Sequence, residues 1–255
     1  MKNLYLISRQ TFLEIYQSKI LMNVLFLGAL LLFITFVAAE FSYGVADRIA
    51  LDVGLGCLSL SLVGVSIFMG ASLINSEIEN RTLYMVISRP VSRSSFFIGK
   101  MMGLSGILLV NIFGLSLFVF GLYYMLGGSF HYLIPWSLAF IYIESLLVLY
   151  CVVFFSLVSN TALTVLITLS LYVTGHAIEG VKETGFYANR GWVQAIVDFY
   201  SIYFPNLEKF NVKTFVLYDN ILESSYLYSS LAYALLWIFI FLGASLFVIS
   251  KKDFS

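Results

Sequence analysis

Glu144 is a charged side chain inside a stretch of otherwise uncharged, apolar residues. An ionised carboxylate in a hydrocarbon core is costly, so we expect this group to be protonated or hydrogen-bonded to a neighbouring helix, with Asn111 as its partner. Two roles fit such a residue. It can be a structural tether between helices, or it can take part in a pathway or a conformational switch. The sequence leaves both roles open.

Two stripes of small and hydroxyl-bearing side chains fall on single faces of predicted helices. Such stripes allow helices to pack closely, which we expect here, and they can equally line a path or a seam between two copies of the chain. The first stripe contains Gly56, Ser59, Ser66 and Gly70, and the second contains Thr161, Thr164, Thr168 and Gly175, with Tyr172 beside it.

Catalytic or metal chemistry finds little support in the sequence. No serine with histidine, and no histidine with aspartate, occurs at a spacing that suggests a nucleophile and its base. His131 and His176 lack a third metal ligand, so we expect ordinary histidines near the external face and no metal site. No Gly-x-x-x-x-Gly-Lys-Ser/Thr run occurs, and Cys57 and Cys151 lie in apolar segments. We therefore expect no enzyme activity and no cofactor in this chain.

A polar, basic insertion covers residues 77–100, between two apolar segments. A connection between membrane helices needs only a few residues, so a polar segment of this length indicates a docking element. Glu77 and Arg81 are four residues apart in the order that favours a helical ion pair, which predicts a short cytoplasmic helix over about 76–86. The residues expected to end this helix and to cap the next are Pro90 and then Ser92 or Ser94.

Composition places the chain in a membrane. It has 255 residues, of which 60% are hydrophobic and only 11% charged, and this excludes a soluble globular domain of average make-up. Six apolar segments are long enough to cross a hydrocarbon core as helices, the fifth being the shortest. They cover residues 20–39, 53–74, 101–126, 133–158, 161–177 and 226–250.

Residues 1–19 precede the first predicted span and form an amphipathic pattern, with Thr11 on the polar face and Tyr5 on the apolar one. We expect a helix along the cytoplasmic surface. The first span is expected to stay uncleaved, because its apolar run is too long for a signal peptide. With six spans, both termini and residues 76–100 share the side that carries nine of the 14 lysines and arginines, which predicts that this side is cytoplasmic.

Residues 178–225 form a long external region that is too rich in aromatic side chains for a free loop. We expect short helices that dip into the outer leaflet or lie on it. Binding of an extracytoplasmic partner is the alternative.

The insertion between the second and third spans resembles the coupling region of permease subunits of type-2 ABC exporters. The resemblance implies that it docks in a cleft of a separate subunit, which binds ATP and Mg and hydrolyses the ATP. The match departs at Arg81, where the family often has glycine. The leader, the basic tail and the order of the spans also fit, so the resemblance covers nearly the whole chain. Its residues are Glu77, Glu79, Thr82, Ser88, Pro90, Arg93 and Lys100.

The resemblance implies an all-α integral membrane fold: six transmembrane helices, an N-terminal amphipathic helix, a coupling helix between spans two and three, and short re-entrant or interfacial helices before span six. It also implies a bacterial inner-membrane assembly of two permease copies, identical or closely related, with two ATPase subunits. Membrane lipids are expected partners and nucleic acid is not.

The implied function is ATP-driven export of a lipid-like or hydrophobic substrate, or the driving of extracytoplasmic machinery. A self-sufficient secondary transporter or channel and a membrane anchor of another complex are the alternatives. An intramembrane enzyme is the class that the residues favour least.

Overall fold

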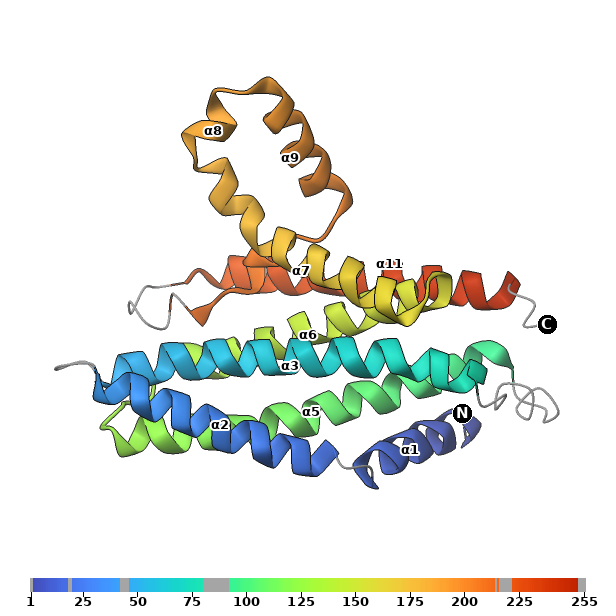
Figure 1. Cartoon of the computed structure of the whole chain (residues 1–255), viewed down its shortest axis with the longest axis horizontal. Helices are drawn as coiled ribbons and strands as arrows, with labels where there is room; N and C mark the ends of the chain where they lie inside the picture. The colour runs from blue at the N-terminus through green and yellow to red at the C-terminus, as the bar shows by residue number, and fades with distance from the viewer. Residues whose placement is uncertain are drawn as a thin grey trace.

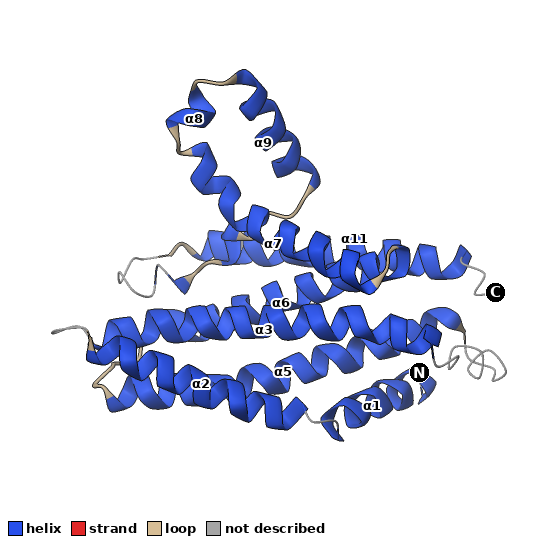
Figure 2. Ribbon diagram, viewed as in Figure 1, coloured by secondary structure: helices blue, strands red, loops and turns tan. Residues whose placement is uncertain are grey.

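The computed structural model describes residues 2–17, 20–41, 46–79, 92–213, 215 and 222–251. Every regular element in this part of the chain is a helix (Figure 2). The helices are α1 (Lys2–Gln17), α2 (Ile20–Glu40), α3 (Ala46–Glu79), α5 (Arg93–Met125), α6 (Leu133–Val158), α7 (Thr161–Lys182), α8 (Gly185–Ala188), α9 (Gly191–Tyr203), a 3-10 turn η1 (Glu208–Phe210), and α11 (Ser224–Lys251).

Among the described residues, five helices are long and apolar enough to cross a membrane: α3, through its stretch Ala46–Ser72, and α5, α6, α7 and α11. The first predicted span forms α2, which contributes a shorter apolar stretch, Phe26–Ala38. The chain is therefore an all-α, multi-pass membrane protein with five candidate spans.

Helix α6 has the predicted bounds 133–158, whereas α3, α5 and α7 extend past the apolar windows that predicted them. Helix α3 continues to Glu79, so the start of the polar insertion extends this helix, while the remainder of the predicted coupling helix lies outside the described residues. Helix α5 begins at Arg93, and the Ser92 side chain accepts a hydrogen bond from the Ser95 backbone N–H at 3.3 Å, which confirms Ser92 as its cap. Helix α7 ends at Lys182, five residues beyond the predicted 161–177.

The long helices lie side by side along one axis (Figure 1). Helix α3 packs against α6 and α5, and α11 packs against α6. The start of α1, the end of α3, the start of α5 and the end of α11 lie at one end of this bundle, whereas α8 and α9 project away from it (Figure 1). The fully buried leucines of the core come from three helices: Leu55, Leu58 and Leu62 of α3, Leu104, Leu108 and Leu115 of α5, and Leu133, Leu147 and Leu149 of α6.

Helix α1 packs on the first turns of α5, and a glycine permits the contact. A Cβ atom on Gly103 would lie 2.8 Å from Thr11 Cβ and 3.0 Å from the Ser8 carbonyl oxygen. Thr11, expected on the polar face, is only 2% exposed, while Tyr5 and Leu6 are 69% and 55% exposed. Thr11 and Phe12 therefore face α5, where a Cβ atom on Gly106 would lie 3.3 Å from the Phe12 ring, while Tyr5 and Leu6 face outward.

Helices α8 and α9 lie in the predicted external region and pack against the end of α7. Ile178 of α7 and Val193 and Val197 of α9 form a small core. Tyr187 donates a hydrogen bond to Asp198 at 2.9 Å, and this bond raises the pKa of the Tyr187 phenol, which keeps it protonated as a donor. The opposite face of α9 carries exposed apolar side chains, namely Trp192, Ile196, Phe199, Ile202 and Tyr203.

Candidate functional site

A pocket of about 180 Å³ with both polar and apolar walls lies among α3, α6, α7 and residues 205–213, the segment that joins α9 to the region before α11. Apolar side chains such as Ile141 and Phe210 make up the rest of its wall. The polar groups that line it are Ser59, Ser137, Glu144, Tyr172, His176, Asn211 and Lys213.

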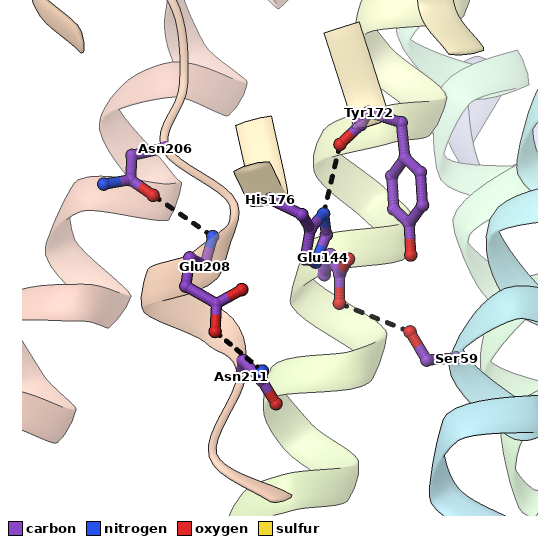
Figure 3. Close-up of polar contacts among 7 residues, drawn as sticks. All are labelled: Ser59, Glu144, Tyr172, His176, Asn206, Glu208 and Asn211. Atoms are coloured by element: carbon purple, nitrogen blue, oxygen red, sulfur yellow. Dashed lines mark hydrogen bonds and ion pairs between the residues drawn. The ribbon is translucent and has the colours of Figure 1, made fainter. Parts of the chain in front are cut away.

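Glu144 is only 4% exposed and lies 11 residues into α6, roughly 16 Å along the helix axis. Its Oε1 atom is 3.2 Å from His176 Nε2 (Figure 3). Ser59 donates a long hydrogen bond of 3.5 Å to Oε2. Within the described part of the chain, Oε1 accepts no hydrogen bond of good geometry, so its contact with His176 is a close pairing of acid and base.

Two expectations about this region are wrong. His176 is not an ordinary interface histidine, because α7 continues beyond it to Lys182 and its ring faces the buried carboxyl of Glu144. Asn111 is not a partner of Glu144. It is buried in α5, and its Nδ2 atom has no hydrogen-bond partner among the described residues.

The imidazole of His176 is held on both of its nitrogens (Figure 3). Nδ1 lies 3.1 Å from the backbone carbonyl oxygen of Tyr172, while Nε2 faces Glu144. The rings of Tyr172 and His176 also lie together, with centroids 4.6 Å apart. The Tyr172 phenol in turn lies against Ser59 and Glu144, so the acid, the base and two hydroxyls form one cluster.

Residues 205–213 close the pocket by packing tightly on α7 and α6. The Leu207 backbone N–H donates to the Gly175 carbonyl at 3.1 Å, and a Cβ atom on Gly175 would lie 2.9 Å from Leu207 Cγ. Phe210 stacks on Phe140 of α6 with ring centroids 6.2 Å apart, and each of these rings is at most 2% exposed. The apolar side chains of Leu207 and Phe210 therefore hold this wall of the pocket against α7 and α6.

Polar contacts brace the same segment. Asn206 donates from Nδ2 to Glu179 of α7, and its backbone N–H donates to Tyr233 Oη of α11 at 2.9 Å. Asn211 donates to Glu208 Oε1 at 2.8 Å (Figure 3). The two bonds of Asn206 connect the segment to α7 and α11, and the bond of Asn211 lies within the segment.

Lys213 brings a further charge to the pocket, and sequence reasoning missed it because residues 178–225 were expected to be external. A Cβ atom on Gly56 of α3 would lie 3.7 Å from Lys213 Nζ, so the ammonium group sits at the α3 side. No described carboxylate lies within salt-bridge distance of it. The described residues also contain no group of three His, Cys, Asp or Glu that could hold a metal ion.

The two predicted stripes divide between the pocket and the core. Gly56, Ser59 and Tyr172 line the pocket together with Glu144. Other members pack within this chain: Ser66, Thr164 and Thr168 are at most 1% exposed, and a Cβ atom on Gly70 would lie 2.8 Å from Val152 of α6. Thr161 is exposed at the start of α7.

The predicted docking residues lie around the gap between α3 and α5. Glu77 and Glu79 belong to the last turn of α3, and Arg93 is the first residue of α5. Lys100 follows in α5, with Nζ 5.4 Å from the centre of the Phe96 ring. The predicted residues Arg81, Thr82, Ser88 and Pro90 lie outside the described residues.

No protein-family model and no curated protein matches this chain.

The pocket can hold a proton between an acid and a base and can donate hydrogen bonds from two hydroxyls and an ammonium group. Its volume is below the roughly 300–1,000 Å³ typical of pockets for drug-sized ligands. A single copy of the chain thus offers a site for a proton or a small polar group and too little room for a whole lipid.

Proposed function

We propose that the chain is the membrane permease subunit of an ATP-driven exporter of the type-2 ABC class, with ATP hydrolysed by a separate subunit. The observation that carries the proposal is the coupling-like sequence between α3 and α5. Helix α3 has 34 residues and a length of roughly 51 Å at 1.5 Å per residue, against about 30 Å of hydrocarbon. Its polar end therefore reaches beyond the bilayer and offers a lever for a docked subunit.

The proposed topology has six spans, with α2 as the first and both termini in the cytoplasm of a bacterial cell. The helix ends gathered at one end of the bundle support it (Figure 1). Arg93, Lys100 and Lys251 belong to helix segments at that end, in line with the positive-inside rule. The end of α3 and the residues that follow it, to about 86, dock the ATPase in this arrangement.

The proposed assembly has two permease copies and two ATPase subunits. Because the pocket of one copy is too small for a lipid, a lipid-like or hydrophobic cargo would pass between copies, or the assembly would drive extracytoplasmic machinery. The exposed apolar face of α9 suits the outer leaflet or an external partner.

A second candidate, a self-sufficient secondary transporter, is favoured by one specific observation. Glu144, His176 and Lys213 place three ionisable groups around a single pocket, and such groups within membrane segments commonly mark ion or proton pathways.

Purification of the tagged chain from detergent-solubilised native membranes distinguishes the two candidates. The permease proposal predicts that an ATP-hydrolysing subunit co-purifies in equal amount and that the complex turns over ATP. A chain that purifies alone under mild conditions, with no ATP turnover, would favour the secondary transporter.

A further inference from the structure

The two contacts of the His176 imidazole determine how many protons the pair of Glu144 and His176 must hold. Tyr172 presents a carbonyl oxygen to His176 Nδ1 at 3.1 Å, and a carbonyl oxygen only accepts hydrogen bonds. Nδ1 must therefore carry a hydrogen for this contact to be favourable. In a neutral imidazole with Nδ1 protonated, Nε2 carries a lone pair and only accepts.

The second contact then needs a proton of its own. Nε2 lies 3.2 Å from Glu144 Oε1, and this close approach is favourable only when the pair holds one proton, either on the carboxyl or on the imidazole. Both arrangements leave the pair with no net charge, which suits a residue that is only 4% exposed.

Removing this proton leaves no favourable arrangement of His176. If Nδ1 keeps its hydrogen, the Nε2 lone pair faces a carboxylate oxygen at 3.2 Å. If the hydrogen moves to Nε2, the Nδ1 lone pair faces the Tyr172 carbonyl at 3.1 Å. In each case the imidazole loses one of its two favourable contacts, and the buried pair gains a negative charge.

Other charges near the pair act in opposite directions. Lys213, on the segment that closes the pocket, carries a positive charge, and Glu208 on the same segment carries a negative one, so their effects on a bound proton oppose each other. Tyr172 of α7 and Ser59 of α3 contribute hydroxyls. Glu179 of α7 accepts a hydrogen bond from the Asn206 side chain, and Tyr233 of α11 accepts one from the Asn206 backbone N–H.

We propose that Glu144 and His176 form a proton-binding site and that the bound proton holds α7 and residues 205–213 closed over the pocket. The same helix turn that carries His176 also carries Gly175, whose carbonyl accepts from Leu207 of the closing segment at 3.1 Å. Loss of the proton makes His176 and Glu144 repel each other, so this turn of α7 moves away from α6. The Gly175 carbonyl moves with it, and the wall formed by residues 205–213 loses its attachment. The site belongs to this chain alone and holds whether or not an ATPase partner exists.

A cysteine in the pocket reports its opening. Gly56→Cys places a thiol beside Lys213, where a Cβ atom meets only ordinary contact. Cys57→Ala and Cys151→Ala remove the two native thiols. The full-length chain is placed in nanodiscs of phosphatidylethanolamine and phosphatidylglycerol, and the rate of modification by a small methanethiosulfonate is measured from about pH 5 to about pH 10, a range that brackets the ordinary pKa of histidine.

The matched control carries Glu144→Gln in the same background. Its amide can donate to Nε2 at every pH, so this pocket stays closed, and the ordinary rise of thiolate with pH is common to both proteins. The rate measured with Glu144 intact is divided by the rate of the Glu144→Gln control. We expect this ratio to rise by about tenfold as pH increases, the order expected when one buried acceptor loses its donor. A ratio that stays constant across the range would overturn the proposal.

A spectroscopic measurement covers the case in which the glutamine variant fails to fold. His131→Asn leaves His176 as the single histidine, and the asparagine oxygen can still accept from the Leu133 backbone N–H. In ¹⁵N-histidine NMR and infrared spectra of this protein, the His176 and Glu144 signals are expected to change together at each pH transition, because the transitions of a coupled pair belong to both groups. A carboxyl signal that changes at a different pH from the imidazole signal, with neither group responding to the other, would show two independent groups and contradict the shared site.

Discussion

Replacing Glu77 and Glu79 with lysine is expected to remove the ATPase subunit from the purified complex while the chain still inserts in the membrane. Both residues lie in the last turn of α3, where acidic side chains oppose the helix dipole. Lysine there favours the helix by about 0.3–1 kcal/mol per residue, so loss of binding cannot be ascribed to unfolding of α3. Reversal of charges in an interface typically costs about 2–5 kcal/mol, which weakens capture by roughly 30-fold or more.

The measurement is the amount of ATPase subunit recovered per permease, together with its ATP turnover. The matched control is the double variant Glu183→Lys and Glu223→Lys. Both residues are exposed and acidic, and they lie away from the end of α3: Glu183 directly follows α7 and Glu223 directly precedes α11. This control is expected to retain the subunit. Equal recovery and turnover in both double variants would refute docking at the end of α3.

Replacing His176 with alanine is expected to lower the free energy of unfolding by about 3 kcal/mol. The change leaves the carboxyl of Glu144, 4% exposed, without the base that lies 3.2 Å away. Breaking a buried pair costs about 3–5 kcal/mol, and the lower value applies because Glu144 can take up a proton. Thermal unfolding in detergent measures the loss.

A double variant separates the pair from the packing of His176. Adding Glu144→Gln to His176→Ala removes the stranded acid and should recover most of the lost stability. His131→Ala is the single-site control. It removes a weak 3.3 Å contact with the Leu133 backbone N–H and should cost less than about 1 kcal/mol. Equal losses for the two histidine variants, without recovery in the double variant, would mean that the pair contributes no specific stability.

The apolar windows of the sequence located the membrane helices and both ends of α6, but not the ends of α3 or α7 or the start of α5. A window ends where apolar residues end, whereas backbone hydrogen bonds continue into the interface. This difference decides the position of His176. With a span over 161–177 the residue falls at the membrane face, but in the observed helix it is followed by more than one further turn. The ionisable Glu144 was identified correctly as unusual, and its partner was not.

The closing wall of the pocket carries no local signal in the sequence. Phe210 and Lys213 lie more than 60 residues after Glu144 in the chain, and their contacts arise only from tertiary packing. The many aromatic residues of this region predict short interfacial helices, whether or not some of them pack into the helix bundle as Phe210 does. Ser92, in contrast, was predicted as a cap because its bond to Ser95 depends only on residues three apart.

The central claim is that ATP bound to a separate subunit moves this chain, and a distance between two copies tests it most directly. Ser94, exposed near the start of α5, is replaced by a spin-labelled cysteine in the background without Cys57 and Cys151, and the captured complex is examined by pulsed electron spin resonance. We predict a dipolar signal between two copies whose distance changes when ATP and Mg are added. The absence of a signal between copies, or a distance that ATP leaves unchanged, would contradict the claim.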